Sequence, residues 1–150
     1  MKKTAVGAAS LVMALLLASC ASSTAKQKIE GKRVSIPESL KETGMEAVEN
    51  ADTAIISFDA NATTGYSWEY TLDGNGVVEE ESSSYITDGH TEGIVGYGGR
   101  QQYIFTGIGE GQTTATFCYR RPWDSSSGIY TVTVTFKVGR GNKLTIVDIR

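Results

Sequence analysis

The sequence predicts an all-β fold, a sandwich of about seven to eight antiparallel strands, and three observations carry this prediction. From about residue 33 onward, apolar residues follow no sustained helical period. Short runs rich in Thr, Val, Ile and Tyr recur instead, separated by turns that contain Gly, Asp and Ser. The clearest runs alternate between two faces, as half-buried strands do. Strands of this length and spacing indicate a sandwich or a barrel.

The first 19 residues are predicted to be a signal peptide and not part of the fold. Two lysines, Lys2 and Lys3, precede an apolar stretch that is shorter than the roughly 20 residues of a membrane-spanning helix. The stretch ends in Leu-Ala-Ser-Cys20, which resembles the lipobox of bacterial lipoproteins, where the cysteine becomes the lipidated first residue. We therefore expect Cys20 to carry lipid. An ordinary secretory signal with an incidental cysteine is the alternative.

Residues 20–32 are predicted to be the lipidated cysteine and a flexible tether, because they are small, polar and charged. The folded domain is predicted to span residues 33–150. With Cys20 lipidated, Cys118 has no intramolecular partner, so no disulfide is expected. We expect the chain to be exported and anchored to a bacterial membrane, with its domain in the periplasm or at the cell surface. Ala21 is not the aspartate associated with inner-membrane retention, which mildly favours the outer membrane.

Composition argues against several classes of function. The formal net charge is -3, from 14 Lys and Arg against 17 Asp and Glu, whereas nucleic-acid binders carry a basic face. Removing residues 1–19 takes away two lysines, which leaves 12 basic residues against 17 acidic ones and a net charge of -5. One His and two Cys are too few for a zinc site built on these ligands. No metal or cofactor is predicted, and a monomer is expected.

The candidate strands follow one another closely along the domain. Residues 38–49 have room for a helical turn, but Gly44 interrupts it, so mostly loop or edge strand is predicted there. Trp68 lies in an early central strand and is the expected anchor of the core, which favours an immunoglobulin-like sandwich. Glu79 to Glu81 are predicted to be a solvated edge. The candidate strands are residues 53–59, 66–72, 77–87, 101–106, 113–120 and 129–138, and residues 144–149 extend an edge.

Two of these runs define their faces well enough to predict which side chains are buried. In residues 113–120, Ala115, Phe117 and Tyr119 share one face, and Thr116, Cys118 and Arg120 share the other. In residues 129–138, the apolar face carries Tyr130, Val132, Val134, Phe136 and Val138, opposite Ile129, Thr131, Thr133 and Thr135.

Three loops between candidate strands carry the residues that suggest binding. Residues 61–66 (NATTGY) contain Asn and Gly, which form turns at little steric cost. Residues 93–100 (GIVGYGGR) lack the Gly-Lys-Ser/Thr ending of a phosphate loop, so an exposed backbone that approaches another chain is the better interpretation. Residues 121–124 (RPWD) combine a stiffening proline with Trp and Arg, the types enriched in interface hot spots. We call these loops one, two and three.

In this order, the three loops resemble the chagasin family of cysteine protease inhibitors (inhibitor family I42), whose pattern is N-P-T-T-G-Y/F-x-W, then V-G-x-G-G, then R-P-W. The resemblance spans roughly residues 34–138. One departure is Ala62, where proline is usual, which removes a conformational restraint from loop one. The matching residues are Asn61, Thr63, Thr64, Gly65, Tyr66 and Trp68, then Val95, Gly96, Gly98 and Gly99, then Arg121, Pro122 and Trp123.

The resemblance implies an immunoglobulin-like sandwich whose three loops cluster at one end and enter the cleft of papain-like cysteine peptidases. It implies a reversible, non-covalent inhibitor and not an enzyme. Loop one would occupy the catalytic centre, with Thr63 and Thr64 nearest the catalytic groups of the peptidase. Loop two would run along the cleft, and loop three would hold its opposite side. The implied peptidase-binding residues are Asn61, Ala62, Thr63, Thr64, Gly65, Tyr66, Val95, Gly96, Tyr97, Gly98, Gly99, Arg100, Arg121, Pro122 and Trp123.

Two other functions stay open on the sequence alone. One is a surface adhesion or assembly module that uses the same sandwich without a peptidase target. The other is an enzyme with Cys118 as nucleophile and His90 as base, which is disfavoured because Cys118 falls inside a strand and His90 in a loop. The residues do not distinguish a peptidase of the same organism from one of a host.

Overall fold

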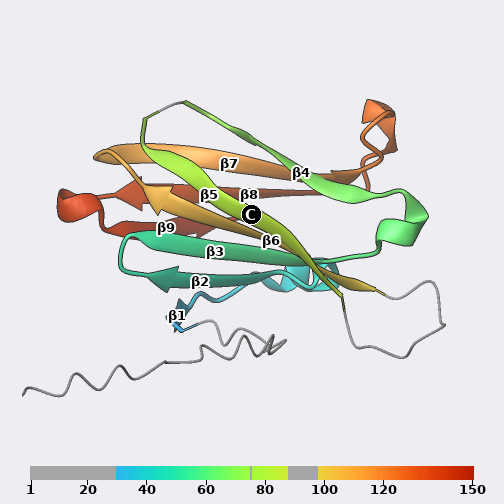
Figure 1. Cartoon of the computed structure of the whole chain (residues 1–150), viewed down its shortest axis with the longest axis horizontal. Helices are drawn as coiled ribbons and strands as arrows, with labels where there is room; N and C mark the ends of the chain where they lie inside the picture. Colours follow the sequence, from blue (N-terminus) through green and yellow to red (C-terminus); the bar gives the residue numbers. More distant parts are fainter. Residues whose placement is uncertain (1–29, 75, 88–97) are drawn as a thin grey trace, which may run out of the picture.

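Two antiparallel sheets pack face to face in the computed structural model, which describes residues 30–74, 76–87 and 98–150 (Figure 1). The predictions for residues 1–29, for His90 and for Val95, Gly96 and Tyr97 lie outside these ranges. The five-stranded sheet has the order β1 (Lys32–Arg33), β2 (Glu46–Asn50), β3 (Thr53–Ala60), β6 (Gly99–Gly107) and β5 (Val78–Thr87). The four-stranded sheet has the order β4 (Ser67–Leu72), β7 (Gly111–Arg120), β8 (Tyr130–Val138) and β9 (Leu144–Ile149).

The predicted all-β sandwich is confirmed, and each candidate strand is present to within two residues at either end. Residues 38–49 differ from the prediction of mostly loop or edge strand. They form a 3-10 helix, η1 (Glu38–Thr43), followed by β2, which pairs with β3 on one side and with β1 on the other. Gly44 ends η1 with a φ of 60°, where an added Cβ would collide with the Asp59 carboxylate. The predicted start of the domain, residue 33, falls inside β1.

The core lies between the sheets and follows the predicted alternation of β7 and β8. Trp68 is 1% exposed, which confirms it as a core residue. Its strand, β4, lies at the edge of the four-stranded sheet, whereas a central strand was predicted. The ring of Trp68 stacks on Phe58 of the other sheet, with centroids 4.0 Å apart and an interplanar angle of 18°. Such a pair contributes about 0.5–1.5 kcal/mol beyond the burial of its area. The inward side chains of β7 and β8 are Ala115, Phe117, Val132, Val134, Phe136 and Val138, all buried.

A side-chain amide holds the backbone of Trp68, immediately after loop one. The Trp68 amide N–H donates to Oε1 of Gln101 at 2.9 Å, and Nε2 of Gln101 donates to the Trp68 carbonyl at 2.8 Å. The indole Nε1 donates to the Asp59 carbonyl at 3.0 Å. Because β4 is an edge strand, its outward backbone groups need partners, and Gln101 supplies them from the other sheet. The start of β4, where the chain leaves loop one, is therefore firmly placed.

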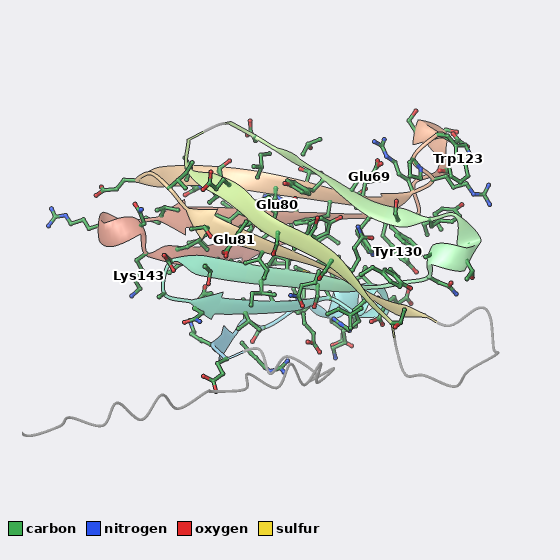
Figure 2. All side chains as sticks on the ribbon, in the orientation of Figure 1. Glu69, Glu80, Glu81, Trp123, Tyr130 and Lys143 are labelled. Carbon is green, nitrogen blue, oxygen red and sulfur yellow. The ribbon has the colours of Figure 1, made fainter. Side chains whose placement is uncertain are left out.

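The edge strand β5 carries the three glutamates that were predicted to be a solvated edge. All three are exposed, and a register shift falls between Glu80 and Ser82. Figure 2 shows Glu80 and Glu81 along this strand. Charges and bulges discourage edge-to-edge pairing of strands, so this edge is protected.

The strands that flank loops one, two and three end at the same end of the sandwich. Ala60, at the end of β3, faces Gly99 at the start of β6, and Gly99 also faces Thr87 at the end of β5. In the other sheet, Ser67 faces Arg120. The 3-10 turns η2 (Ala62–Thr64) and η3 (Ser125–Ser127) lie at this end in Figure 1, and η4 (Arg140–Asn142) lies at the opposite end.

Among the residues described, no helix has both the length and the apolar character that a membrane span requires.

Candidate functional site

Loop one is shaped by its own side chains. It forms the single turn η2, and the Asn61 side-chain oxygen accepts from the Thr63 amide at 3.1 Å and from the Thr63 hydroxyl at 2.6 Å. The Thr64 hydroxyl donates to the Asn61 carbonyl at 2.7 Å. Gly65 ends the turn with a φ of 76°, a conformation that costs other residues strain. The turn-forming residues predicted in this segment therefore hold loop one in a defined, solvent-exposed turn.

Two tyrosine hydroxyls hold the entry of loop one, and neither was predicted from the sequence. The Asn61 amide donates to the Tyr119 hydroxyl at 3.2 Å. The Tyr85 hydroxyl donates to the Ala60 carbonyl at 3.2 Å and accepts from the Ala62 amide at 3.5 Å. These contacts join residues far apart in the sequence, so a local pattern gives no sign of them.

Loop two is described only at its C-terminal side, Gly98 to Arg100. Gly99 lies so close to β5 that an added Cβ would come within 2.5 Å of the Ile86 carbonyl oxygen. The Arg100 guanidinium bonds to the Asp59 carboxylate at 2.7 Å and to the Gly44 carbonyl at 2.8 Å. Arg100 was predicted to contact a peptidase, and that contact stays a prediction. The contacts in the structure instead fix the start of β6 to the end of β3.

Loop three is a tight turn stabilised around Asp124. The Asp124 carboxylate accepts from the Ser126 amide at 3.0 Å and from its hydroxyl at 2.6 Å, which caps η3. The Ser126 hydroxyl, the Ser126 amide and the nearby Arg121 all favour the ionised carboxylate and hold the pKa of Asp124 below its usual range. The Ser127 hydroxyl donates to the Asp124 carbonyl at 2.6 Å and accepts from the Arg121 amide at 2.9 Å.

Loops one and three touch at two points. The indole of Trp123 lies over Gly65, where an added Cβ would come within 2.9 Å of Cη2. The Arg121 guanidinium carbon lies over the ring of Tyr66, 4.9 Å from its centroid, in a cation–π contact. Trp123 nevertheless remains 75% exposed, and Figure 2 shows it at the end of the molecule opposite Lys143. Loop one and loop three therefore form one continuous surface with an indole on it.

Residues 47–138, which contain all three loops, match the family model of the chagasin family peptidase inhibitor I42. The chain belongs to this family. Its members are inhibitors of peptidases and not enzymes.

The chain is also similar to one characterised protein and to two solved structures. Amoebiasin-1 of Entamoeba histolytica is 33% identical over 88 residues, which cover 55% of this chain and 78% of that protein. The crystal structure of EhICP2, a cysteine protease inhibitor from Entamoeba histolytica, has the same fold with a TM-score of 0.50. It is 21% identical and covers 59% of this chain and 79% of its own. The solution structure of Amebosin is 30% identical to this chain, with a TM-score of 0.44. The match covers 56% of this chain and 79% of the Amebosin chain.

The loop end of this chagasin-family domain also gathers exposed apolar side chains. The large hydrophobic side chains that are exposed in the described residues are Tyr85, Ile86, Ile108, Trp123, Ile129 and Val147. Four of them lie in or beside loops two and three: Tyr85 and Ile86 precede loop two, Trp123 lies in loop three, and Ile129 follows loop three. Neither Ile86 nor Ile129 was predicted to belong to the binding site, although Ile129 was placed on the face opposite the apolar one.

The part of the chain that the structure describes contains no group of three or more His, Cys, Asp and Glu placed to hold a metal ion. Cys118 is a free, half-buried thiol inside β7, as its place in a strand predicted. Its Sγ atom lies 3.2 Å from where a Cβ on Gly128 would be, so the thiol packs against the residue that follows η3. The proposed partner of Cys118 as a nucleophile, His90, lies outside the described residues.

Proposed function

We propose that this chain is a reversible, non-covalent inhibitor of papain-like cysteine peptidases, which occludes their active-site cleft with three loops. Membership of the chagasin family supports the inhibitory function. The observation that carries the three-loop part is the contact between Trp123 and Gly65, because it makes two of the loops into one surface at one end of the domain.

Each loop has its own task in this proposal. Loop one places Thr63 and Thr64 at the catalytic centre, since its turn is exposed and internally hydrogen-bonded. Loop three presents the exposed indole of Trp123 to one wall of the cleft. Loop two lays its glycine-rich backbone, residues 94–100, along the cleft. Trp and Arg are the side chains most often found at the energetic centre of an interface, which favours Trp123 and Arg121 as anchors.

The rigidity of the loops favours tight binding. Loops one and three are already ordered by their own hydrogen bonds, so little conformational entropy remains to be lost on association. A protease–inhibitor interface of standard size buries about 1,600 Å² in total, which is compatible with nanomolar affinity when the loops are preorganised.

We further propose that the inhibitor is a monomer, exported and held on a bacterial membrane by lipid on Cys20. The tether would then run from Cys20 to the residue before β1, which begins at Lys32, and would let the domain stand away from the membrane surface. The target would be a peptidase that reaches the periplasm or cell surface, whether it comes from the same organism or from a host. Mass spectrometry of the membrane fraction tests the anchor, because lipidation of Cys20 adds the mass of the acyl chains to a chain that begins there.

A dilution experiment tests reversible occlusion. Papain is incubated with a small excess of the full chain in detergent and then diluted far below the dissociation constant. We expect the activity of papain to recover completely. Deletion of residues 63–65 is expected to abolish inhibition while the thermal unfolding transition persists. Lys143→Ala, a change at the opposite end of the domain, serves as the control and should inhibit like the unmodified chain (Figure 2). Activity that fails to recover, or inhibition that survives the deletion, would contradict the proposal.

A further inference from the structure

We infer that Tyr85 is a positioning residue of the binding site, whose hydroxyl holds loop one in its inhibitory shape. The inference rests on the proposed function, because it assigns a role within the same loops. Tyr85 lies in β5, two residues before the strand ends and leads toward loop two. It belongs to none of the three loop motifs, and its side chain is partly exposed.

The Tyr85 hydroxyl spans the entry of loop one. It donates to the carbonyl of Ala60 at 3.2 Å and accepts from the amide of Ala62 at 3.5 Å, so it bonds the chain on both sides of Asn61. Asn61 itself donates its amide to the Tyr119 hydroxyl. Tyr85 comes from the five-stranded sheet and Tyr119 from the four-stranded one. The entry of loop one is thus fastened to both layers of the sandwich.

The ring of Tyr85 makes a second connection, to the end of loop two. It packs over Gly99, where an added Cβ would come within 2.8 Å of the ring carbon Cζ and of the hydroxyl oxygen. The same side chain therefore contacts Gly99, at the end of loop two and the start of β6, and also the start of loop one. A change at Tyr85 is therefore expected to affect how loop one sits relative to Gly99 and the start of β6.

The amide of Ala62 makes the role of the hydroxyl testable. A proline at this position has no N–H to donate and instead fixes its own φ. The backbone accepts proline there, because Ala62 is the first residue of η2 and the preceding Asn61 is extended, with φ and ψ of -135° and 99°. The bond to Tyr85 and a proline ring are therefore alternative restraints on the same residue.

The test is a double-mutant cycle between Tyr85→Phe and Ala62→Pro, measured on the full chain in detergent with papain. Tyr85→Phe keeps the ring over Gly99 and removes only the hydroxyl. One hydrogen bond of ordinary strength corresponds to an increase of about three- to tenfold in the inhibition constant. Adding Ala62→Pro to Tyr85→Phe is expected to restore the inhibition constant to within about twofold of the original chain. In the original chain, which keeps the Tyr85 hydroxyl, Ala62→Pro should change the inhibition constant much less than it does in Tyr85→Phe.

A second measurement does not depend on the peptidase. Exchange of the backbone amides of residues 62–65 with solvent should be about three- to tenfold faster in Tyr85→Phe, while amides of the core strands stay unchanged. Tyr130→Phe is the matched control. Within the described residues, its hydroxyl makes no hydrogen bond, so its loss should leave exchange in loop one unaltered.

Two results would overturn the inference. One is a Tyr85→Phe chain whose loop-one exchange matches that of the original chain. The other is weaker inhibition that Ala62→Pro does not restore, which would mean that the hydroxyl contacts the peptidase directly. If the original chain fails to inhibit papain, the proposed function fails. The exchange rates then still decide whether Tyr85 fastens loop one.

Discussion

The indole of Trp123 lies over the backbone of Gly65, although 58 positions separate them in the chain. An added Cβ on Gly65 would come within 2.9 Å of Cη2 of the indole, a separation that real Cβ atoms do not show. Gly65 also has a φ of 76°, in the left-handed region. The glycine is therefore required twice, once by the turn of loop one and once by the contact with loop three.

A comparison of Gly65→Ala with Gly76→Ala separates the requirement for a positive φ from the requirement for space beneath the indole. Gly76 has a φ of 85°, and apart from its chain neighbours no atom of the described residues lies within 4 Å of its would-be Cβ. Alanine there therefore meets similar backbone strain of roughly 1–2 kcal/mol without displacing an indole. We expect both variants to lose thermal stability. Only Gly65→Ala should weaken inhibition of papain, by about tenfold or more. Equal inhibition constants for the two variants would show that the contact with Trp123 has no part in binding.

Trp123→Ala should weaken inhibition by at least about tenfold, because a buried tryptophan at an interface contributes disproportionately to binding. The domain itself should keep its thermal stability, since the side chain is exposed in the free chain. Ile108→Ala is the control, because Ile108 is also exposed but lies in the turn between β6 and β7. An inhibition constant unchanged by Trp123→Ala would remove this residue from the site.

Asn61→Ala should loosen loop one, because the side-chain oxygen accepts two hydrogen bonds from Thr63. Loss of such a cap costs about 0.5–2 kcal/mol, which corresponds to a weakening of inhibition of roughly two- to thirtyfold if the loop must be ordered to bind. Asn61→Asp keeps the accepting oxygen and should retain most of the inhibition. An aspartate variant as weak as the alanine variant would indicate that the amide group, and not the cap, is what matters.

The low pKa of Asp124 predicts how loop three responds to acid. The fold holds this pKa below its usual range, mainly through the hydrogen bonds from Ser126. At a pH above the usual pKa of aspartate, the ionised carboxylate of Asp124 therefore stabilises the loop. This stabilisation is lost as the pH falls through the lowered pKa of Asp124. Fluorescence of Trp123, taken as the difference from Trp123→Phe, should stay constant from pH 7 to about pH 4 and change only below it. A transition between pH 5 and 7 would contradict this account, and Asp124→Asn should abolish the acid transition.

The fold follows from patterns that are local in the sequence. The alternation in β7 and β8 indicates which side chains are buried, because successive residues of a strand point to opposite faces. Residues 38–49 were harder to predict, because β2 is only five residues long. Both ends of β2 carry charged or polar side chains, and only Ala47 and Val48 are buried. The tertiary contacts of β2 with β3, and not its own pattern, make it a strand.

The site was predictable in part. The turn formers Asn61 and Gly65 predict the turn of loop one, and the three loop motifs together indicate the family of the chain. The contact of Trp123 with Gly65 and the hydroxyl of Tyr85 were not predictable, because both depend on how strands 23 or more positions apart are brought together. Arg100 is a different case. Its place beside the glycines of loop two suggested a contact with a peptidase, but in the structure its guanidinium bonds to Asp59 within the domain.

The most direct test of the central claim is the titration of papain with the full chain, followed by mass spectrometry of the inhibitor. We expect tight inhibition with a measurable inhibition constant and an uncleaved chain, as reversible occlusion by preorganised loops requires. A chain that is folded, as judged by its thermal transition, yet does not inhibit papain at micromolar concentration would contradict the account. So would a chain that papain cuts within loop one.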